Sequence, residues 1–449
     1  MRRRSRDLAA GMAVVVAATG LTACGGGGDA ESGGGKKLHV LVGAKPEYSK
    51  ELRAWMADTK KKFKAKTGAD ITFETFSSPE QEQQKIQTSV VSGTGPDVYS
   101  LGTTFTPVAH STKAFHEFTP EDWKKVGGRE RFIPQSLAMS GPDKKHEIGV
   151  PTAMRPYGMV YNKAMFKEAG IKAPPKTWDE YVSYAKKLNK PKEGTYGAAV
   201  DYSDGFNPWK YIWASTLQSG GRLVSEDLKK AQLDSPEARA AVGSLFDLTA
   251  KHKVVDPKST GWKAPQALSA FSGGKAAMLG MVTPGAVPSL EKSKVKDDYA
   301  FAPMPLVPEG EKSRPAGGVP AGTIVSGDAV AVAKYSKNKD LALEYIKLTT
   351  SAKEQTSYAK TFGDLPTDKG AAQALAKNDP QVAAFVKAED AAVPTPFTGA
   401  WADVQLGIQN VVTQSLPSLS RGNYDPAAVK KLLAKADKTT QSSIDRQKR

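Results

Sequence analysis

Residues 150–181 decide the fold, and they read VPTAMRPYGMVYNK (Val150–Lys163) followed, after one alanine, by MFKEAGIKAPPKTWDEY (Met165–Tyr181). The short apolar run Gly158–Tyr161, which follows a proline and a tyrosine, predicts a buried strand. Thr177 and Glu180 have the spacing of a capping box, in which each side chain satisfies a backbone N–H of the other residue. This stretch therefore predicts a strand and, after a Pro/Gly-rich turn, a helix with an apolar face.

Strands and helices alternate through the rest of the chain. Capping residues, glycine stops and apolar residues at helical spacing predict helices that begin near residues 52, 78, 177, 235, 351 and 425. The expected strands are Leu38–Val42, Ile71–Phe76, Asp97–Leu101, Gly158–Tyr161, Ala276–Val282 and Ala329–Ala333. This alternation predicts an α/β fold with largely parallel sheets. Pro/Gly-rich texture near Val150–Ala153 and Pro308–Gly322 marks places where the chain crosses between domains.

The first residues are typical of a targeting segment. Four arginines precede an uncharged, mostly apolar stretch, Leu8–Thr22, which is shorter than the ~20 residues that a spanning helix needs. The stretch ends in Leu-Thr-Ala-Cys, which resembles the lipobox of bacterial lipoproteins. That resemblance implies cleavage before Cys24, lipid (palmitate and similar acyl chains) on its sulfur, and a location on the extracytoplasmic face of the cell membrane. The alternative is an ordinary secretory signal with a chance cysteine.

Composition narrows the class of the remaining chain. Cys24 is the only cysteine, so a disulfide within the chain and a thiolate metal site are both excluded. The net charge is +16, and it falls to +13 without the first 23 residues, which hold four arginines and one aspartate. The lysines are scattered along predicted helices, which favours solvated surfaces and attraction to anionic lipid or wall polymer over nucleic-acid binding.

Motifs of metal, nucleotide and hydrolase chemistry are missing. The five histidines do not share helix-turn spacing, and no Walker loop, GxSxG elbow or HExxH motif occurs. We therefore expect no cofactor, no metal and no enzymatic activity. Paired carboxylates of a glycan-degrading enzyme stay possible, because such pairs meet only in the folded chain.

Four blocks carry a resemblance to a known family. They are FKAKTG with SGTGPDV (Phe63–Gly68 and Ser92–Val98), the opening stretch Val150–Tyr181, AFSGGKAAM (Ala270–Met278), and Gly317 and Gly318 with SKNKDLALEYI (Ser336–Ile346) and Gly363–Pro366. Together they resemble the extracellular solute-binding proteins of carbohydrate-type ABC importers, the family that includes maltose-binding proteins. The resemblance implies a type II periplasmic-binding-protein-like fold, whose two discontinuous lobes are joined by a hinge and close on a ligand. It also implies delivery of the solute to the transmembrane subunits of an ABC permease, by a monomer.

With this resemblance the chain divides as follows. Residues 1–23 are the expected signal peptide and residues 24–37 a Gly/Ser-rich flexible tether. Residues 38–151 plus 315–366 form the expected N-terminal lobe, and residues 152–314 plus 367–449 form the expected C-terminal lobe.

The resemblance also indicates where ligand contacts lie. Trp401 follows a loop where the family commonly has a stacking aromatic, and of Trp209 and Trp213 we expect one at the cleft and one in the core. At two positions where maltose-binding types have tryptophan, this chain has Leu101–Thr104 and Val282–Gly285, which argues against maltodextrin. The full set of expected ligand contacts is Lys45, Glu47, Thr103, Thr104, Arg155, Tyr157, Asp204, Trp209, Trp213, Thr283, Phe397, Trp401 and Gln405.

The expected ligand is a mono- or oligosaccharide, and two alternatives stay open. Arg155 stands where maltose-binding types carry a carboxylate, so the same scaffold could bind another, anionic solute. A secreted glycan-active enzyme is the second alternative. For each aromatic residue, a purely structural place in the core competes with a place at the ligand.

Overall fold

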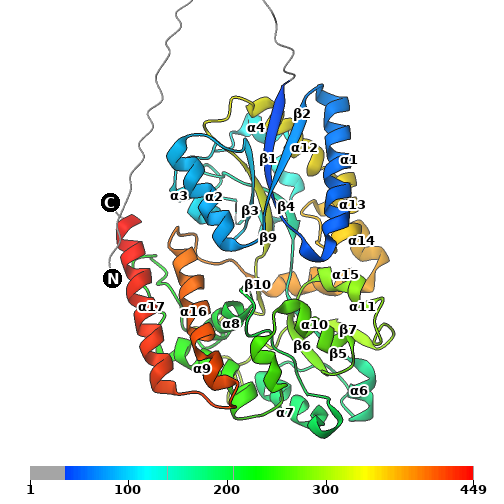
Figure 1. Ribbon diagram of the computed structural model, residues 1–449, viewed down its shortest axis with the longest axis vertical. Helices are drawn as coiled ribbons and strands as arrows, with labels where there is room; N and C mark the ends of the chain where they lie inside the picture. Colours follow the sequence, from blue (N-terminus) through cyan, green and yellow to red (C-terminus); the bar gives the residue numbers. More distant parts are fainter. Residues whose placement is uncertain (1–35, 139, 206, 448–449) are drawn as a thin grey trace, which may run out of the picture. The chain divides into compact units, whose positions relative to one another are not determined.

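A five-stranded sheet in the order β2-β1-β3-β9-β4 organises the first lobe (Figure 1). The computed structural model describes residues 36–449 except residues 139, 206, 448 and 449. Along β1, Leu38, Val40 and Val42 enter one core and Leu41 enters another, so both faces of the sheet are covered. The strands are β1 (Lys37–Gly43), β2 (Asp70–Phe76), β3 (Val98–Gly102), β4 (Val150–Met154) and β9 (Gly327–Val332).

Helices lie on both sides of this sheet (Figure 1). The glycine stop at Gly68 takes a left-handed conformation (φ 75°), which a residue without a side chain adopts at little cost. Ser78 accepts a hydrogen bond from the Gln81 backbone N–H and starts the next helix. The helices are α1 (Ser49–Thr67), α2 (Pro79–Ser92), α3 (Thr106–Ser111), α4 (Pro120–Lys125), α5 (Pro134–Leu137), α12 (Lys339–Thr349) and α13 (Ala352–Phe362).

The second lobe is built on a three-stranded sheet in the order β6-β5-β7. Its strands are β5 (Gly158–Asn162), β6 (Met278–Val282) and β7 (Tyr299–Ala302), and its helices are α6 (Lys163–Glu168), α7 (Trp178–Leu188), α8 (Pro208–Gln218), α9 (Pro236–Ala250), α10 (Ala264–Ser272), α11 (Val287–Leu290), α14 (Lys369–Asn378), α15 (Pro380–Ala388), α16 (Trp401–Leu419) and α17 (Pro426–Gln447). The capping box of Thr177 and Glu180 opens α7 as predicted.

The prediction of largely parallel sheets is only partly right. β1 pairs in parallel with β2 and β3, but β9 is antiparallel to both of its neighbours, and β5 is antiparallel to β6 and β7. Apolar pattern identifies a strand without giving its direction. Direction depends on the end of the sheet at which the chain re-enters, and here the chain returns from the other lobe.

Three segments connect the lobes. The first is Arg155–Tyr157, between β4 and β5. The second follows β8 (Thr323–Ile324), which pairs with β10 (Ala392–Val393). Residues 319–324, expected in the N-terminal lobe, pack against the second lobe. They do so through this pairing and through the Val319 backbone N–H, which donates to the Leu217 carbonyl of α8. The third is the segment from Gly363 to Asp368 after α13, where Leu365 exchanges two backbone hydrogen bonds with Met154.

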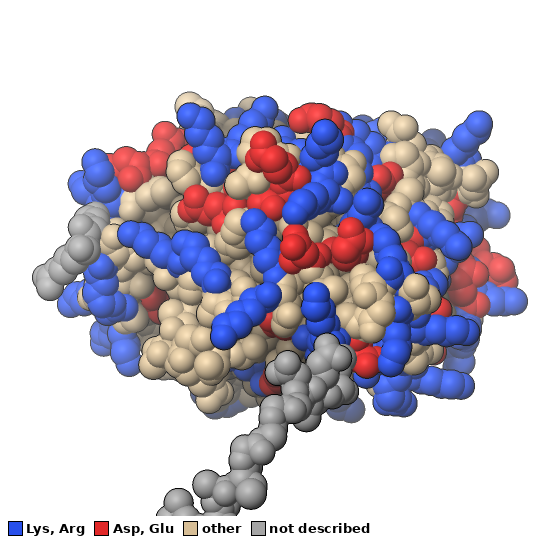
Figure 2. Space-filling view, turned by 90° about the horizontal axis from the view of Figure 1, so that it is seen from above, with Lys and Arg blue, Asp and Glu red and all other residues tan. Residues whose placement is uncertain are grey.

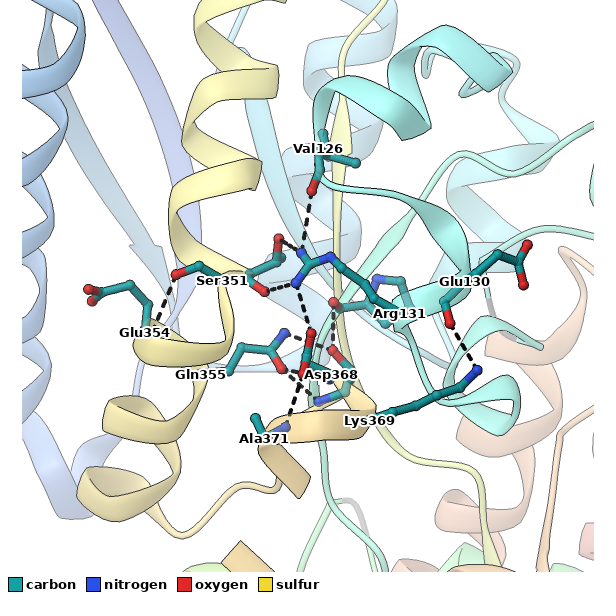
Figure 3. Close-up of polar contacts among 12 residues, drawn as sticks. Val126, Glu130, Arg131, Ser351, Glu354, Gln355, Asp368, Lys369 and Ala371 are labelled. Carbon is teal, nitrogen blue, oxygen red and sulfur yellow. Dashed lines mark hydrogen bonds and ion pairs between the residues drawn. The ribbon is translucent and has the colours of Figure 1, made fainter. Parts of the chain in front are cut away.

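A polar network holds the third connecting segment against the first lobe (Figure 3). The Arg131 guanidinium donates to the Thr350 carbonyl (2.6 Å) and pairs with Asp368 (3.1 Å). The Gln355 side-chain oxygen accepts the backbone N–H groups of Thr367 and Asp368 (2.8 and 2.9 Å). These contacts fix the position of the segment, and with it the position of Asp364, which pairs with Lys45 and Arg155.

The surface is basic without being uniform. In the view from above, Lys and Arg side chains are spread across the face and Asp and Glu side chains lie among them (Figure 2). Between residues 36 and 449, apart from the four positions left out, no helix is long and apolar enough to cross a membrane.

Candidate functional site

A cavity of about 230 Å³ lies where the ends of β1, β3, β4 and β9 meet the start of α8. The first lobe supplies most of its wall, and Tyr157, Trp209 and Lys210 close it from the second lobe. Polar ends of several strands and a helix thus converge on one space between the lobes, as small-molecule sites at domain interfaces commonly do.

Aromatic rings form part of the wall. Trp55 of α1 and Tyr358 of α13 stand edge to face, with ring centroids 5.6 Å apart. On the opposite lobe Trp209 is 2% exposed, and Trp401 packs against it edge to face at 6.0 Å. Rings from both lobes thus line the cavity, and aromatic rings can pack against the C–H faces of a ring-shaped ligand.

A cluster of charges lies beside the aromatic wall. Asp364 accepts from Lys45 Nζ (2.7 Å) and from Arg155 Nε (3.0 Å), and Arg155 also pairs with Asp328. Burial alone would raise the pKa of Asp364, but the Arg155 and Lys45 charges outweigh burial and hold that pKa below its usual value. Both cations are therefore paired with carboxylates of the protein, so neither is an unpaired charge.

Glu82 of α2 lines the cavity a short way from this cluster. Its Oε1 accepts the Gly102 backbone N–H at 2.9 Å. Burial, with a smaller contribution from the Asp328 charge, raises the pKa of Glu82 to about 8, against the opposing effects of the Gly102 N–H and of Arg155. The carboxyl group is thus mostly neutral at pH 7.

Lys210 brings a buried ammonium group to the second-lobe side. Its Nζ donates to the Tyr157 hydroxyl (2.6 Å) and to Asn207 Oδ1 (3.3 Å) and lies 4.2 Å from the centroid of the Tyr157 ring. This contact links α8 to the first connecting segment, so Lys210 and Tyr157 are fixed relative to each other.

Six of the expected contact residues line the cavity, namely Lys45, Thr103, Thr104, Arg155, Tyr157 and Trp209. Thr103 is held by its backbone N–H, which donates to the Gly327 carbonyl (3.0 Å). The side chain of Glu47 and the whole of Cys24 lie outside the described residues.

The other expected contacts lie elsewhere in this structure. Trp401 is fully buried in the second-lobe core, between the rings of Trp209 and Trp213, and Trp213 is a core residue too. Gln405 is buried one turn further along α16. The aromatic at the start of α16 supports the cavity wall from behind, because Trp209 occupies the place in front of it.

Three remaining positions have local structural roles. The Asp204 carboxylate accepts the backbone N–H groups of Asn207 (3.1 Å) and Ala264 (3.2 Å). The rings of Phe397 and of His110 on α3 have centroids 5.5 Å apart, and Thr283 precedes a short 3₁₀ turn without a side-chain hydrogen bond to it. None of the three lines the cavity.

Sequence reasoning missed several residues that line or support the cavity. They are Trp55, Glu82, Lys210, Asp328, Tyr358 and Asp364. Asp364 could have been found from the sequence, since it lies in the block Gly363–Pro366 that carries the family resemblance. Trp55 was recognised only as a helix-face residue, and the remainder sit in helices or strands whose pattern gives no sign of a cavity.

The described residues contain no group of three or more His, Cys, Asp or Glu side chains placed to hold a metal ion. The site offers aromatic faces, hydroxyl groups, a neutral carboxyl and compensated charges. This is the chemistry of holding a small polar molecule.

Known proteins are similar to this chain in sequence and in fold. The chain is 28% identical over 439 residues to the diacetylchitobiose binding protein DasA of Streptomyces coelicolor, covering 95% of this chain and 97% of the relative. A solute-binding protein of an ABC transporter from Thermotoga lettingae, bound with α-D-tagatose, has a TM-score of 0.74 at 22% identity, covering 91% of this chain and all of that one. Maltose-bound MalE3 of T. maritima also has a TM-score of 0.74 at 22% identity, covering 90% and 99%.

These structural neighbours confirm the two-lobed type II periplasmic-binding-protein fold expected from the sequence. The family described as bacterial extracellular solute-binding protein matches residues 46–356, which is more than half of the chain. The chain belongs to the bacterial extracellular solute-binding protein family.

Proposed function

We propose that this protein captures a neutral mono- or oligosaccharide outside the cell and delivers it to the permease subunits of an ABC importer. The observation that carries the proposal is the cavity between the lobes, which combines aromatic faces from both sides with polar groups whose charges are already balanced. Sugars present apolar ring faces edged with hydroxyl groups, so this combination suits them.

The pairing of charges favours a neutral ligand over an anionic one. Lys45 and Arg155 are engaged by Asp364 and Asp328, so an anion would have to displace a carboxylate or add a charge beside one. The names of relatives agree with a sugar: DasA and NgcE of Streptomyces coelicolor are diacetylchitobiose binding proteins, and a relative from Pyrococcus abyssi is a maltotriose-binding protein.

We further propose that the chain is a monomeric lipoprotein, cleaved before Cys24 and anchored by lipid on that residue at the extracytoplasmic face of the membrane. Two acyl chains on one residue give stable anchoring, which a single chain does not. The Gly/Ser-rich tether of residues 24–37 would then keep the binding lobes close to the permease.

Isothermal titration of the mature chain against a panel of saccharides tests the proposal. The panel is diacetylchitobiose, cellobiose, maltose, maltotriose and tagatose, with glucuronate and glutamate as anionic comparators. We expect heat with at least one neutral saccharide and none with the two anions. Binding of an anion alone would favour the anionic alternative, and release of products from any saccharide would favour an enzyme.

A further inference from the structure

One oxygen of the Glu82 carboxyl group makes no hydrogen bond within the described part of the protein. Glu82 lies in the first turn of α2, is 4% exposed and lines the cavity. Its Oε1 accepts the Gly102 N–H, whereas Oε2 makes no hydrogen bond or ion pair with the residues that the structure describes. Oε2 is not among the fully enclosed atoms that lack a partner, so it is open to the cavity, where a group of the ligand can become its hydrogen-bond partner.

The surroundings of Glu82 decide what this oxygen presents. Asp328 of β9 opposes ionisation and Arg155 of the first connecting segment favours it, as does the Gly102 N–H of β3. Lys45 and Asp364 lie beyond Arg155 and pair with each other. Burial outweighs the favourable contacts and raises the pKa of Glu82 to about 8. Because Oε1 already accepts a hydrogen, the proton resides on Oε2, which then acts as a donor.

A donor selects for an acceptor. A sugar hydroxyl can donate or accept, and so it matches a charged and a neutral carboxyl group alike. An amide carbonyl, as in an acetamido substituent, only accepts, and a neutral carboxyl group can bond to it where a carboxylate cannot.

We infer that Glu82 is a specificity-determining residue which donates a hydrogen bond from Oε2 to a carbonyl acceptor on the bound sugar, so that the site prefers an acetamido sugar to its hydroxyl counterpart. This inference rests on the proposed function and makes its ligand class narrower. It places the discriminating group on the first lobe, whereas Trp209 lines the cavity from the second lobe.

The test compares diacetylchitobiose with cellobiose, which differ in having acetamido groups or hydroxyl groups at the same ring positions. Affinities are measured by isothermal titration at pH 7 and pH 9 for the wild-type mature chain, Glu82→Gln and Glu82→Leu. For the wild type we expect diacetylchitobiose to bind at least tenfold more tightly than cellobiose at pH 7. Its affinity should fall about tenfold by pH 9, as the neutral form of a group with a pKa of about 8 becomes the minor one.

The two variants separate donation from mere packing. Glu82→Gln keeps a donor and an acceptor without a titrating proton, so we expect affinity within about threefold of wild type at pH 7 and no decline to pH 9. Glu82→Leu lacks the donor, and we expect at least a tenfold loss for diacetylchitobiose with little change for cellobiose. Gln84→Leu, at an exposed position on the same helix, is the matched control and should bind as the wild type does.

Several outcomes overturn the inference. They are a decline of Glu82→Gln from pH 7 to pH 9 equal to that of the wild type, an unchanged sugar preference in Glu82→Leu, and no wild-type binding of diacetylchitobiose. In the last case, heat with another saccharide of the panel leaves the proposed function intact, and no heat with any saccharide overturns both.

Discussion

Asp364 is the residue on which the charge balance of the cavity depends. It receives one hydrogen bond from Lys45 and one from Arg155, and its side chain is 4% exposed. A carboxylate in this position orients two long cationic side chains that follow different strands, Lys45 after β1 and Arg155 after β4. Without it, two cations would face each other in a poorly hydrated space, which is costly.

We expect Asp364→Asn to lower the free energy of unfolding by about 2–3 kcal/mol at pH 7, because the amide keeps the shape but not the charge. The pKa of Asp364 is held below its usual value, so its contribution is complete above the pKa of the unfolded chain, near 4, and is lost as the pH falls through the folded value. Urea unfolding should therefore show a larger difference between the variant and the wild type at pH 7 than at pH 3.

Asp340→Asn is the control for this prediction. Asp340 pairs with Lys125 at 3.0 Å, but its side chain is 88% exposed, and exposed pairs contribute between zero and about 1 kcal/mol. A loss from Asp364→Asn no larger than from Asp340→Asn would show that the cluster at the cavity is not stabilising.

At the scale of elements, three tryptophans meet where α8 packs against α16, and they have two different roles. Trp209 reaches the cavity, whereas Trp401 and Trp213 fill the core behind it. The rings of Trp209 and Trp401 touch edge to face, so the core determines how far the cavity wall projects.

We expect Trp401→Leu to lower the free energy of unfolding by about 2–4 kcal/mol while changing ligand affinity less than threefold. We expect Trp209→Leu to weaken saccharide binding at least tenfold, because it removes a ring from the cavity wall. Thermal unfolding and isothermal titration on both variants check the assignment. The reverse pattern, with affinity lost mainly in Trp401→Leu, would place Trp401 at the ligand.

How far the sequence determines these elements can be seen in particular residues. The caps at Ser78, Thr177, Ser235 and Ser351 act within one turn, so local reading places the helices correctly. The direction of β9 and the partner of β8 depend on contacts across more than sixty residues and could not be read locally.

The candidate site shows the same division. Arg155 and Tyr157 could be predicted from the sequence because they directly follow a strand within a recognisable motif. Glu82 and Tyr358 line the cavity from two helices. In the sequence, the helix faces that carry these residues look like ordinary surface, so only the folded structure shows that the two residues share a cavity. Trp401 lies in the second-lobe core of this structure, and its contact with ligand stays a prediction, because a tryptophan before a helix suits a core as well as a cavity.

At the scale of the whole molecule, side-chain contacts join the two lobes directly. The Tyr48 hydroxyl, just after β1, donates to the Gly285 carbonyl, just after β6, at 2.6 Å. On α3, His110 packs against Phe397 of the second lobe. Lobe closure is a hinge motion, and contacts made only in the closed form add to ligand affinity.

We expect Tyr48→Phe to weaken saccharide binding about fivefold, because one hydrogen bond between the lobes, worth about 1 kcal/mol, is removed from the closed form. Small-angle scattering should show that more ligand is needed to compact the variant. Tyr335→Phe, which loses a bond to the Pro96 carbonyl within the first lobe, is the control and should bind normally. Equal affinities for Tyr48→Phe and wild type would mean that the bond is present in the open form as well.

Cys24→Ala tests the proposed anchor. We expect the variant to leave the membrane fraction, to retain its affinity for the ligand and to support slower uptake, since tethering raises the local concentration near the permease. Immunoblots of cell fractions, titration of the purified variant and uptake of labelled sugar measure these three effects. Retention of the variant in the membrane fraction would contradict the assignment.

The position of β9 governs the order in which the molecule can be assembled. This strand, residues 327–332, lies between β3 and β4, so the gap between them stays open until about three quarters of the chain has been made. Contacts between segments so far apart form slowly, and an open strand edge is prone to wrong partners in the meantime. Residues 37–102 are thus synthesised early but reach their final packing late. The first sheet of a growing chain therefore stays incomplete for most of its synthesis.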